Sequence, residues 1–279
     1  MKKSLFILSA LAILATSMSA QGLKLPSLSP TSTISQEFST STVEIVYSRP
    51  SMRGRKVFGE LVPFGQVWRT GANAATKVTF GEDVVINGTT VKAGSYSFYT
   101  VPNQNEWEVI FNKNTGNWGA AGYSTSDDVV RLKVKPQTLP FSVETFTMNI
   151  GNITFSSCTI DVMWDRMMIS VPVTVDNQKR LNESITKAIE TPSIPYQQAA
   201  TYYLETNQQL DKALTYATKA TEQNPKAFWL YMLKARIAAK LGNKSVATES
   251  ANKAAEIAKG SAFEAEYAKG AKELIESLK

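Results

Sequence analysis

The most distinctive chemical groups of this 279-residue chain are arginines that lie close together early in the sequence. Arg49, Arg53 and Arg55 share one short stretch, and Arg69 follows Trp68 a little further on. A guanidinium holds carboxylate, sulfate or phosphate through two parallel hydrogen bonds, and nearby glycines let the backbone approach a ligand closely. We therefore predict an anion-binding cleft. The alternative is that these arginines pair with carboxylates or donate to loop carbonyls, because surface charges are usually solvated or paired.

A second candidate is the glycine-rich loop at residues 114–126, which lacks a strand pattern. Aromatic side chains on loops can stack on sugar rings or hold peptides, since they offer a large contact area. The alternative is that Trp118 folds back and covers one end of the β region. Asn73 is either a polar recognition group or a left-handed turn residue. The predicted binding residues are Arg49, Arg53, Arg55, Arg69, Asn73, Trp118 and Tyr123.

Catalytic groups are sparse, because the chain has no histidine and one cysteine. This excludes a Ser–His–Asp triad, histidine-bound zinc and an internal disulfide. Asp127 and Asp128, or Asp161 and Asp165, are the carboxylates that a glycoside hydrolase would need about 5–10 Å apart. Adjacent strand residues point to opposite faces, so Asp127 and Asp128 do not converge without a bulge. Asp161 and Asp165 share a face only if their strand continues past Met163. Cys158 alternates with apolar neighbours and is predicted to be a buried, inert thiol. We predict no catalytic residue, no metal site and no cofactor.

Residues 1–20 have the pattern of an export signal. Two lysines precede an apolar run from Leu5 to Ala15, and small residues follow up to Ala20. The run is too short to span a bilayer, and Cys158 is too far away to be a lipoprotein attachment site. We predict a cleaved signal, a periplasmic or secreted location and no membrane span in the mature chain. The net charge of +6 is modest and gives no reason to expect a nucleic-acid partner.

Two periodicities divide the rest of the chain. Residues 21–36 are rich in Ser, Thr and Pro and are predicted to be a flexible arm. Residues 37–176 alternate between apolar and polar side chains, which is typical of β-strands. Because turn signals are frequent and no helical pattern intervenes, we predict an antiparallel β-sandwich.

Local signals support this β region. Asn87-Gly88 predicts a tight hairpin turn, and Gly151-Asn152 predicts another that joins residues 148–150 to residues 153–155. Trp68, Trp107 and Trp164 lie in alternating runs, so we expect them to pack in the core.

Residues 177–279 have a helical pattern, with a predicted helix at 177–190 and a final one at 261–278. Between them, at about 192–259, the sequence repeats every 34 residues, with Ala213 and Ala217 recurring as Ala247 and Ala251. This period and these small residues resemble tetratricopeptide repeats, in which two antiparallel helices pack closely. Two repeats bury too little surface alone, so the flanking helices are predicted to cap a short α-hairpin array. Such arrays usually present a surface to a protein partner.

Residues 47–80, from Tyr47 through Trp68 to Phe80, form the most characteristic stretch of the chain. Together with AGSYSFYTVP at 93–102, EWEVIFNK at 106–113 and DVVRLKVKP at 128–136, this stretch resembles the domain-of-unknown-function 2911 family. The resemblance extends over about residues 35–180. It implies an exported envelope protein with a β-rich domain, often followed by repeat-like helices, and it implies no catalytic residue.

The sequence therefore predicts an exported, non-enzymatic binding protein for an anionic or sugar-like ligand, with a protein partner possible at the helices. Two alternatives stay open. One is a carbohydrate-active hydrolase of the cell envelope that uses paired carboxylates, and the other is a structural envelope scaffold.

Overall fold

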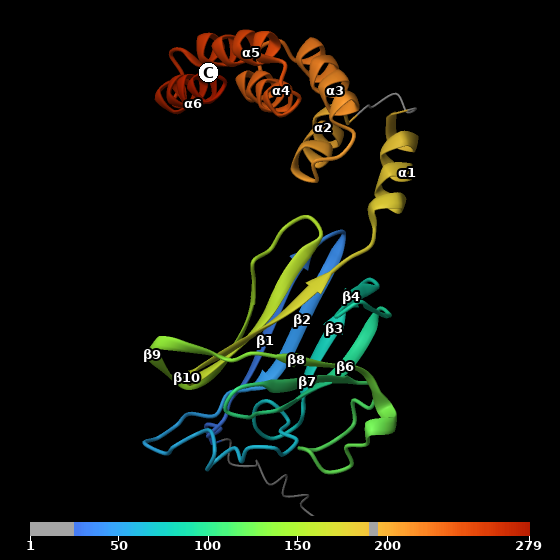
Figure 1. The fold of residues 1–279 in the computed structure, drawn as a ribbon, viewed down its shortest axis with the longest axis vertical. Coiled ribbons are helices and arrows are strands. Elements are labelled where there is room, and N and C mark those ends of the chain that lie inside the picture. The colour runs from blue at the N-terminus through green and yellow to red at the C-terminus, as the bar shows by residue number, and fades with distance from the viewer. Residues whose placement is uncertain (1–24, 190–194) are drawn as a thin grey trace, which may run out of the picture.

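The computed structural model describes residues 25–189 and 195–279, in which strands precede helices (Figure 1). The predicted signal peptide at residues 1–20 lies outside these ranges. The strands are β1 (Thr31–Phe38), β2 (Ser41–Ser48), β3 (Thr76–Phe80), β4 (Val84–Ile86), β5 (Thr89–Val91), β6 (Gly94–Val101), β7 (Trp107–Asn112), β8 (Asp128–Val134), β9 (Gln137–Gly151) and β10 (Ser157–Thr174). The helices are α1 (Gln178–Ile189), α2 (Tyr196–Glu205), α3 (Leu210–Gln223), α4 (Phe228–Lys240), α5 (Lys244–Ala258) and α6 (Glu264–Ser277).

The strands form two antiparallel sheets. The six-stranded sheet has the order β1-β2-β3-β6-β7-β8, and the four-stranded sheet has the order β5-β4-β10-β9. One buried apolar cluster takes side chains from both sheets, including Ile45 and Phe98 of the first and Phe146 and Ile160 of the second. The predicted combination of antiparallel β structure followed by helices is confirmed. The last strand ends at Thr174, close to the predicted start of the helical region at residue 177.

The predicted flexible arm is wrong from Thr31 onward, because residues 31–38 form β1 and pair along their whole length with β2. Thr, Ser and Gln side chains alternate with Ile34 in this edge strand, so the sequence shows little apolar period. Its stability comes mainly from backbone hydrogen bonds to β2, with apolar burial limited to Ile34 and Phe38.

β10 reverses its direction within one strand. An extended strand of its length would span roughly 60 Å. Yet the Val175 amide, just after its end, donates to the Ser156 carbonyl, just before its start, at 2.9 Å. The reversal coincides with Asp165, where the pairing with β9 shifts register on both sides and φ is 52°. Trp164 is thereby placed at the bend, and both ends of β10 lie on the helical side of the molecule (Figure 1).

The first predicted hairpin is confirmed and the second is longer than predicted. Asn87 and Gly88 join β4 to β5 with φ values of 50° and 76°, as a type I′ turn requires. After Gly151, however, the chain enters β10 only at Ser157, so residues 153–155 belong to the connecting loop.

The helices bury their own apolar clusters, separate from that of the sheets. Helices α2 to α5 pack as successive neighbours, and α6 packs on α5. Ala213 and Ala217 of α3, and Ala247 and Ala251 of α5, are completely buried, as the predicted close packing requires. None of the helices in the described ranges has both the length and the apolar composition needed to cross a bilayer.

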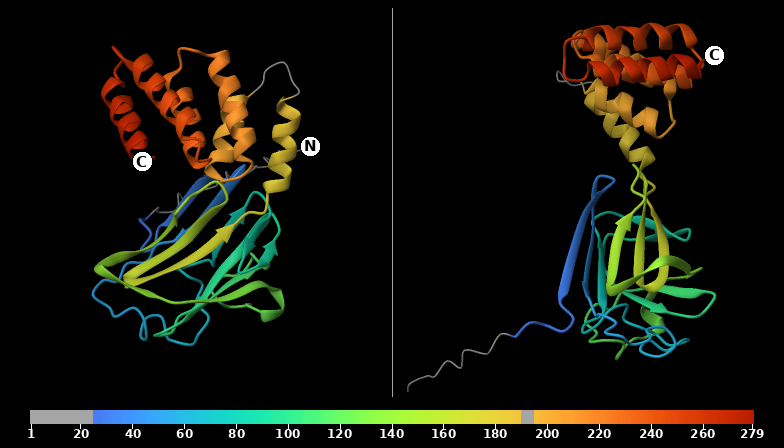
Figure 2. Two further views of the ribbon diagram at one scale, coloured as in Figure 1. Left: turned by 45° about the horizontal axis from the view of Figure 1, so that its top comes forward. Right: turned by 90° about the vertical axis from the view of Figure 1, so that its left-hand side faces the viewer.

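The helices and the loops that precede β3 and β8 lie at opposite ends of the molecule (Figure 2). The loops carry the predicted binding residues, so the candidate site is remote from the helical region.

Candidate functional site

A cavity of about 280 Å³ lies in the segment between β2 and β3. Arg55, Arg69, Trp68, Trp164 and Gly71 are among the residues that line it. The Trp68 and Trp164 rings stack with centroids 5.9 Å apart and an interplanar angle of 18°. The cavity thus combines flat aromatic walls with cationic side chains, which suits a small anion or the acidic group of a larger molecule.

Arg69 is the group in this cavity that lacks a partner. Its Nε is buried without a hydrogen bond, and within the described ranges its side chain makes no ion pair. A buried donor without an acceptor costs about 1–3 kcal/mol. An anion in the cavity that hydrogen-bonded to the Arg69 guanidinium would gain a charge-assisted interaction.

The backbone around Arg69 is strained. Thr70 is completely buried and has φ of 50°, which is rare for a β-branched residue. Gly71 has φ of 146°, and a Cβ there would lie 2.9 Å from the Ser48 carbonyl oxygen. Such strain collects at functional sites, where the surrounding structure holds it in place.

Side-chain hydrogen bonds hold this strained conformation. The Thr70 hydroxyl lies 3.0 Å from that of Thr100, and the Thr76 hydroxyl donates to the Thr70 carbonyl at 2.5 Å. The Trp68 indole N–H donates to the Gly71 carbonyl at 3.1 Å. The wall of the cavity and the turn that carries Arg69 are therefore one connected unit.

Arg49 and Arg53 do not join the cavity, so the prediction that all four arginines share one cleft is wrong. The Arg49 guanidinium donates to the Phe146 carbonyl at 3.1 Å and to the Thr147 hydroxyl at 2.9 Å. The Arg53 guanidinium donates to the Leu28 carbonyl at 3.2 Å. These two residues follow the alternative, in which arginines satisfy carbonyl oxygens and hold the loop in place.

Arg55 and Asn73 lie near the cavity, but their side chains already have hydrogen-bond partners in the protein. Arg55 lines the cavity, but its guanidinium donates to the Met52 carbonyl at 2.8 Å and the Ser51 carbonyl at 2.7 Å. Asn73 has φ of 59° and donates to the Ser29 carbonyl and the Ser48 hydroxyl, each at 3.3 Å. Asn73 is therefore a left-handed turn residue whose side chain fastens the segment before β1.

The Trp118 side chain is 72% exposed, so the alternative that it folds back over the β region is wrong. Its backbone is nevertheless fixed, because Trp118 forms an isolated antiparallel bridge with Ala74. The next residue, Gly119, lies close to Arg69, since a Cβ added to Gly119 would lie 3.2 Å from the Arg69 Nη1. The loop and the cavity thus meet at Arg69.

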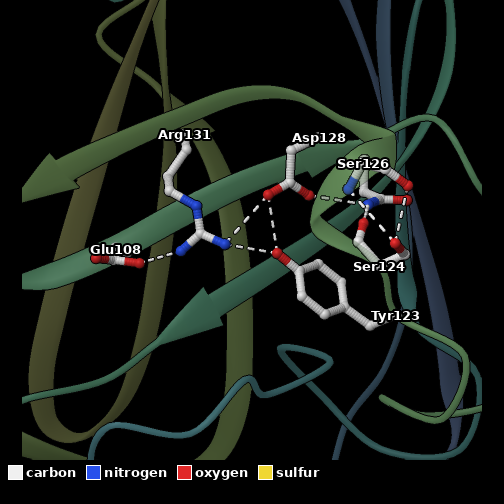
Figure 3. A network of polar contacts seen from close by, with 7 residues as sticks. Glu108, Tyr123, Ser124, Ser126, Asp128 and Arg131 are labelled. Carbon is white, nitrogen blue, oxygen red and sulfur yellow. Dashed lines mark hydrogen bonds and ion pairs between the residues drawn. The ribbon is translucent and has the colours of Figure 1, made fainter.

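Tyr123 anchors this loop instead of facing a ligand (Figure 3). Its hydroxyl donates to Asp128 at 2.8 Å and accepts from Arg131 at 2.5 Å, and Arg131 also pairs with Glu108. Its ring packs against Tyr99 with centroids 5.2 Å apart. Burial, and then the neighbouring Asp128 carboxylate, raise the pKa of the Tyr123 hydroxyl to about 12.

The carboxylates considered for hydrolysis are dispersed. Asp127 pairs with Lys113 at 3.4 Å, and Asp128 belongs to the Tyr123 network. Asp161 is buried, whereas Asp165 accepts from the Ser142 hydroxyl at 3.0 Å at the bend of β10. These aspartates do not line the Arg69 cavity.

Cys158 is 2% exposed, which confirms the predicted buried thiol. Burial is the main cause that raises the pKa of its thiol to about 11. In the described parts of the chain, His, Cys, Asp and Glu side chains do not gather into a metal-binding group.

Two features of the site escape sequence reasoning. Trp68 and Trp164 were expected in the core, and they do pack against it, but the same pair also forms the cavity wall. Thr70 carries no sequence signal of its own strain, although its neighbour Gly71 indicates an unusual backbone. A conformation shared by several residues at one turn is visible only in three dimensions.

Larger hollows exist elsewhere in the described chain but lack this chemistry. One of about 530 Å³ lies between α1 and the α2–α3 pair and is lined mainly by polar residues such as Lys179, Glu183 and Lys212. Another, of about 600 Å³, lies between the β9–β10 loop and α2. Neither is walled by a stacked indole pair beside an arginine with a buried, unsatisfied donor, so the Arg69 cavity is the better candidate.

Comparison with curated proteins and with solved structures gives no match. A family model described as "Protein of unknown function (DUF2911)" matches residues 29–173, which is just over half of the chain. These residues include the β region, the Arg69 cavity and the Trp118 loop. The chain therefore belongs to the DUF2911 family.

Proposed function

We propose that this chain is an exported, non-enzymatic binding protein that takes a small anionic group into the Arg69 cavity. The observation that carries the proposal is the Arg69 guanidinium, which borders an aromatic-walled cavity and has no partner among the described residues. The cation is partly buried, so an incoming carboxylate, sulfate or phosphate gains more than it would at a fully exposed arginine.

The β region serves in this proposal as a rigid β-sandwich scaffold for the site. Its support is the common core of the two sheets, together with the hydrogen bonds that hold the strained turn at Thr70. A preorganised site loses less entropy when it binds.

The helices serve as a tetratricopeptide-like array that binds a protein partner. Helices α3 and α5 begin 34 residues apart, at Leu210 and Lys244, and both bury alanines against neighbouring helices. Export to the periplasm or beyond is proposed on the sequence pattern of residues 1–20 alone.

Titration calorimetry of the full chain with sodium sulfate and sodium acetate tests the proposal. We expect saturable binding of at least one anion, and Arg69→Ala should weaken it about 10- to 100-fold through loss of a charged hydrogen bond. Arg53→Ala is the matched control, because Arg53 belongs to the same segment but lies outside the cavity.

Tryptophan fluorescence gives a second readout, since Trp68 and Trp164 form the wall. If neither anion binds, or if both variants bind like the unchanged chain, the proposal is wrong and a scaffold role is favoured.

A further inference from the structure

The backbone that carries the exposed Trp118 indole passes close to the unpartnered Arg69 guanidinium. Gly119 lies against Arg69, and Trp118 is the residue before it. Because successive Cα atoms are about 3.8 Å apart, the Trp118 Cα lies no more than about 9 Å from the Arg69 guanidinium. Ala72 lines the cavity, and Ala74, two residues later, pairs with Trp118.

The position of Trp118 is fixed by its surroundings. The Ala75 amide donates to the Asn117 carbonyl at 3.4 Å, and the Asn117 side chain donates to the Tyr99 hydroxyl at 3.2 Å. Tyr123 secures the other end of the loop through Asp128 and Arg131. An indole that stays 72% exposed on such a well-anchored loop is held ready for contact.

The surroundings of Trp118 suit a ring with one apolar face and polar edges. Between residues 113 and 127, Trp118 is the single large apolar side chain that is strongly exposed, and its sequence neighbours are mainly Asn, Thr, Gly and Ser with the small Ala120 and Ala121. An apolar peptide would need a continuous apolar surface, which this loop does not provide. A pyranose ring stacks its C–H face on an indole and keeps its hydroxyls in water.

We propose that Arg69 and Trp118 are two subsites for one ligand, an acidic oligosaccharide that carries carboxylate or sulfate groups. The acidic group enters the cavity at Arg69, and a neighbouring sugar ring stacks on Trp118. This inference rests on the proposed function and adds the ligand class. A cavity of about 280 Å³ has room for an acidic group with its own ring, so in this inference the ring stacked on Trp118 is the next one along the chain.

Calorimetry of the full chain with trigalacturonate, a sulfated heparin tetrasaccharide, neutral maltotriose and sodium sulfate tests the inference. We expect at least one acidic oligosaccharide to bind about tenfold or more tighter than sulfate, and maltotriose to bind weakly. Trp118→Ala should weaken acidic oligosaccharide binding about five- to tenfold and leave sulfate binding unchanged. Arg69→Ala should weaken both.

Trp229→Ala is the matched control, because Trp229 is another exposed indole, 42% accessible, on α4. It should change neither affinity. If sulfate binding depends on Arg69 but acidic oligosaccharides bind no tighter than sulfate, or bind independently of Trp118, the inference is wrong and the proposed function stands. If no anion binds, the proposed function itself is wrong. Maltotriose binding as tight as that of the acidic probes would also overturn the inference.

Discussion

At the scale of single residues, the arginines differ in what their neighbours leave free. Arg49, Arg53 and Arg55 donate hydrogen bonds to carbonyl oxygens, whereas the buried Nε of Arg69 has no acceptor. The same residue type therefore stabilises a loop in three places and is available to a ligand in one. Residue type predicts the chemistry of a guanidinium, but only its acceptors decide its role.

The Cys158 thiol should be unreactive in the folded protein. Its pKa is raised to about 11, mainly by burial, so at pH 8 it is both protonated and shielded from reagents. We expect essentially no reaction with a chromogenic disulfide under native conditions and one equivalent in 6 M guanidinium chloride. Rapid native labelling would show that the strand region around Cys158 opens readily.

Tyr123 should contribute a pH-dependent part of the stability. Its pKa is about 12 in the folded chain and 10 in the reference state, so the unfolded state loses this proton first. The contribution is complete below pH 10 and is lost as the pH rises toward 12. Urea unfolding of Tyr123→Phe and the unchanged chain at pH 8, 9, 10 and 11 should give a difference in unfolding free energy that shrinks above pH 10. A constant difference would contradict the assignment.

At the scale of elements, two reversals of the chain build the site. The turn at Thr70 and Gly71 presents Arg69, and the bend of β10 at Asp165 brings Trp164 beside Trp68 in the cavity wall. Both use positive φ, and both are held by pairing with other strands. The cavity therefore depends on backbone conformations that few residues adopt easily.

Gly71→Ala should destabilise the chain and impair the cavity. The added Cβ would lie 2.9 Å from the Ser48 carbonyl oxygen, at a φ of 146° that alanine rarely adopts. We expect a loss of about 1–3 kcal/mol in the free energy of unfolding, measured with urea. Gly54→Ala is the control for positive φ, because its Cβ would meet nothing within 4 Å at a φ of 72°. Equal losses in the two variants would show that the contact with Ser48 is unimportant.

Much of the element pattern follows from the sequence. Alternation in β2, β6, β7 and β8 predicts strands because the period of side chains along a strand is a local property, although β6 and β7 prove to be buried on both faces. Asn87-Gly88 predicts its turn because turn conformation is also local. β1 escapes prediction because its partner supplies backbone hydrogen bonds to a mostly polar strand. The alanine period predicts where α3 and α5 pack, since only small side chains fit there.

The site is less predictable than the elements. Arg49 reaches acceptors at Phe146 and Thr147, almost a hundred residues further along the chain. The stacking of Trp68 on Trp164 joins segments of similar separation. Such contacts depend on the relative placement of the two sheets, which the periodicity of a single strand does not contain.

At the scale of the whole molecule, the β region and the helices meet through a small polar junction. Arg180 of α1 pairs with Glu82 at 2.6 Å, and buried Asn177 donates to the Ser39 hydroxyl. Phe155 and Tyr202 add one ring contact, with centroids 6.3 Å apart. Because the apolar clusters of the two regions share no residue, their folding should be largely independent.

A fragment of residues 21–176 should therefore fold alone. We expect it to remain soluble, to keep the far-ultraviolet β signal and to bind sulfate like the full chain. The full chain should unfold in two resolvable steps, the helices separately from the sheets. Aggregation of the fragment would show that the helices cover apolar surface of the sheets and act as a cap.

The doubling back of β10 also determines how this molecule carries tension. Its second half runs from the bend at Asp165 toward α1, so a pull on the helices passes along the axis of that half-strand to the wall formed by Trp164 (Figure 1). Hydrogen bonds loaded along a strand share the force and resist together, whereas bonds pulled apart from one end yield one at a time. Mechanical rupture is governed by the rate of unfolding rather than by equilibrium stability. If the helices were held by a partner while the Arg69 end of the β region bound a polymer, the force would act along the strands, which is the stronger, shearing direction.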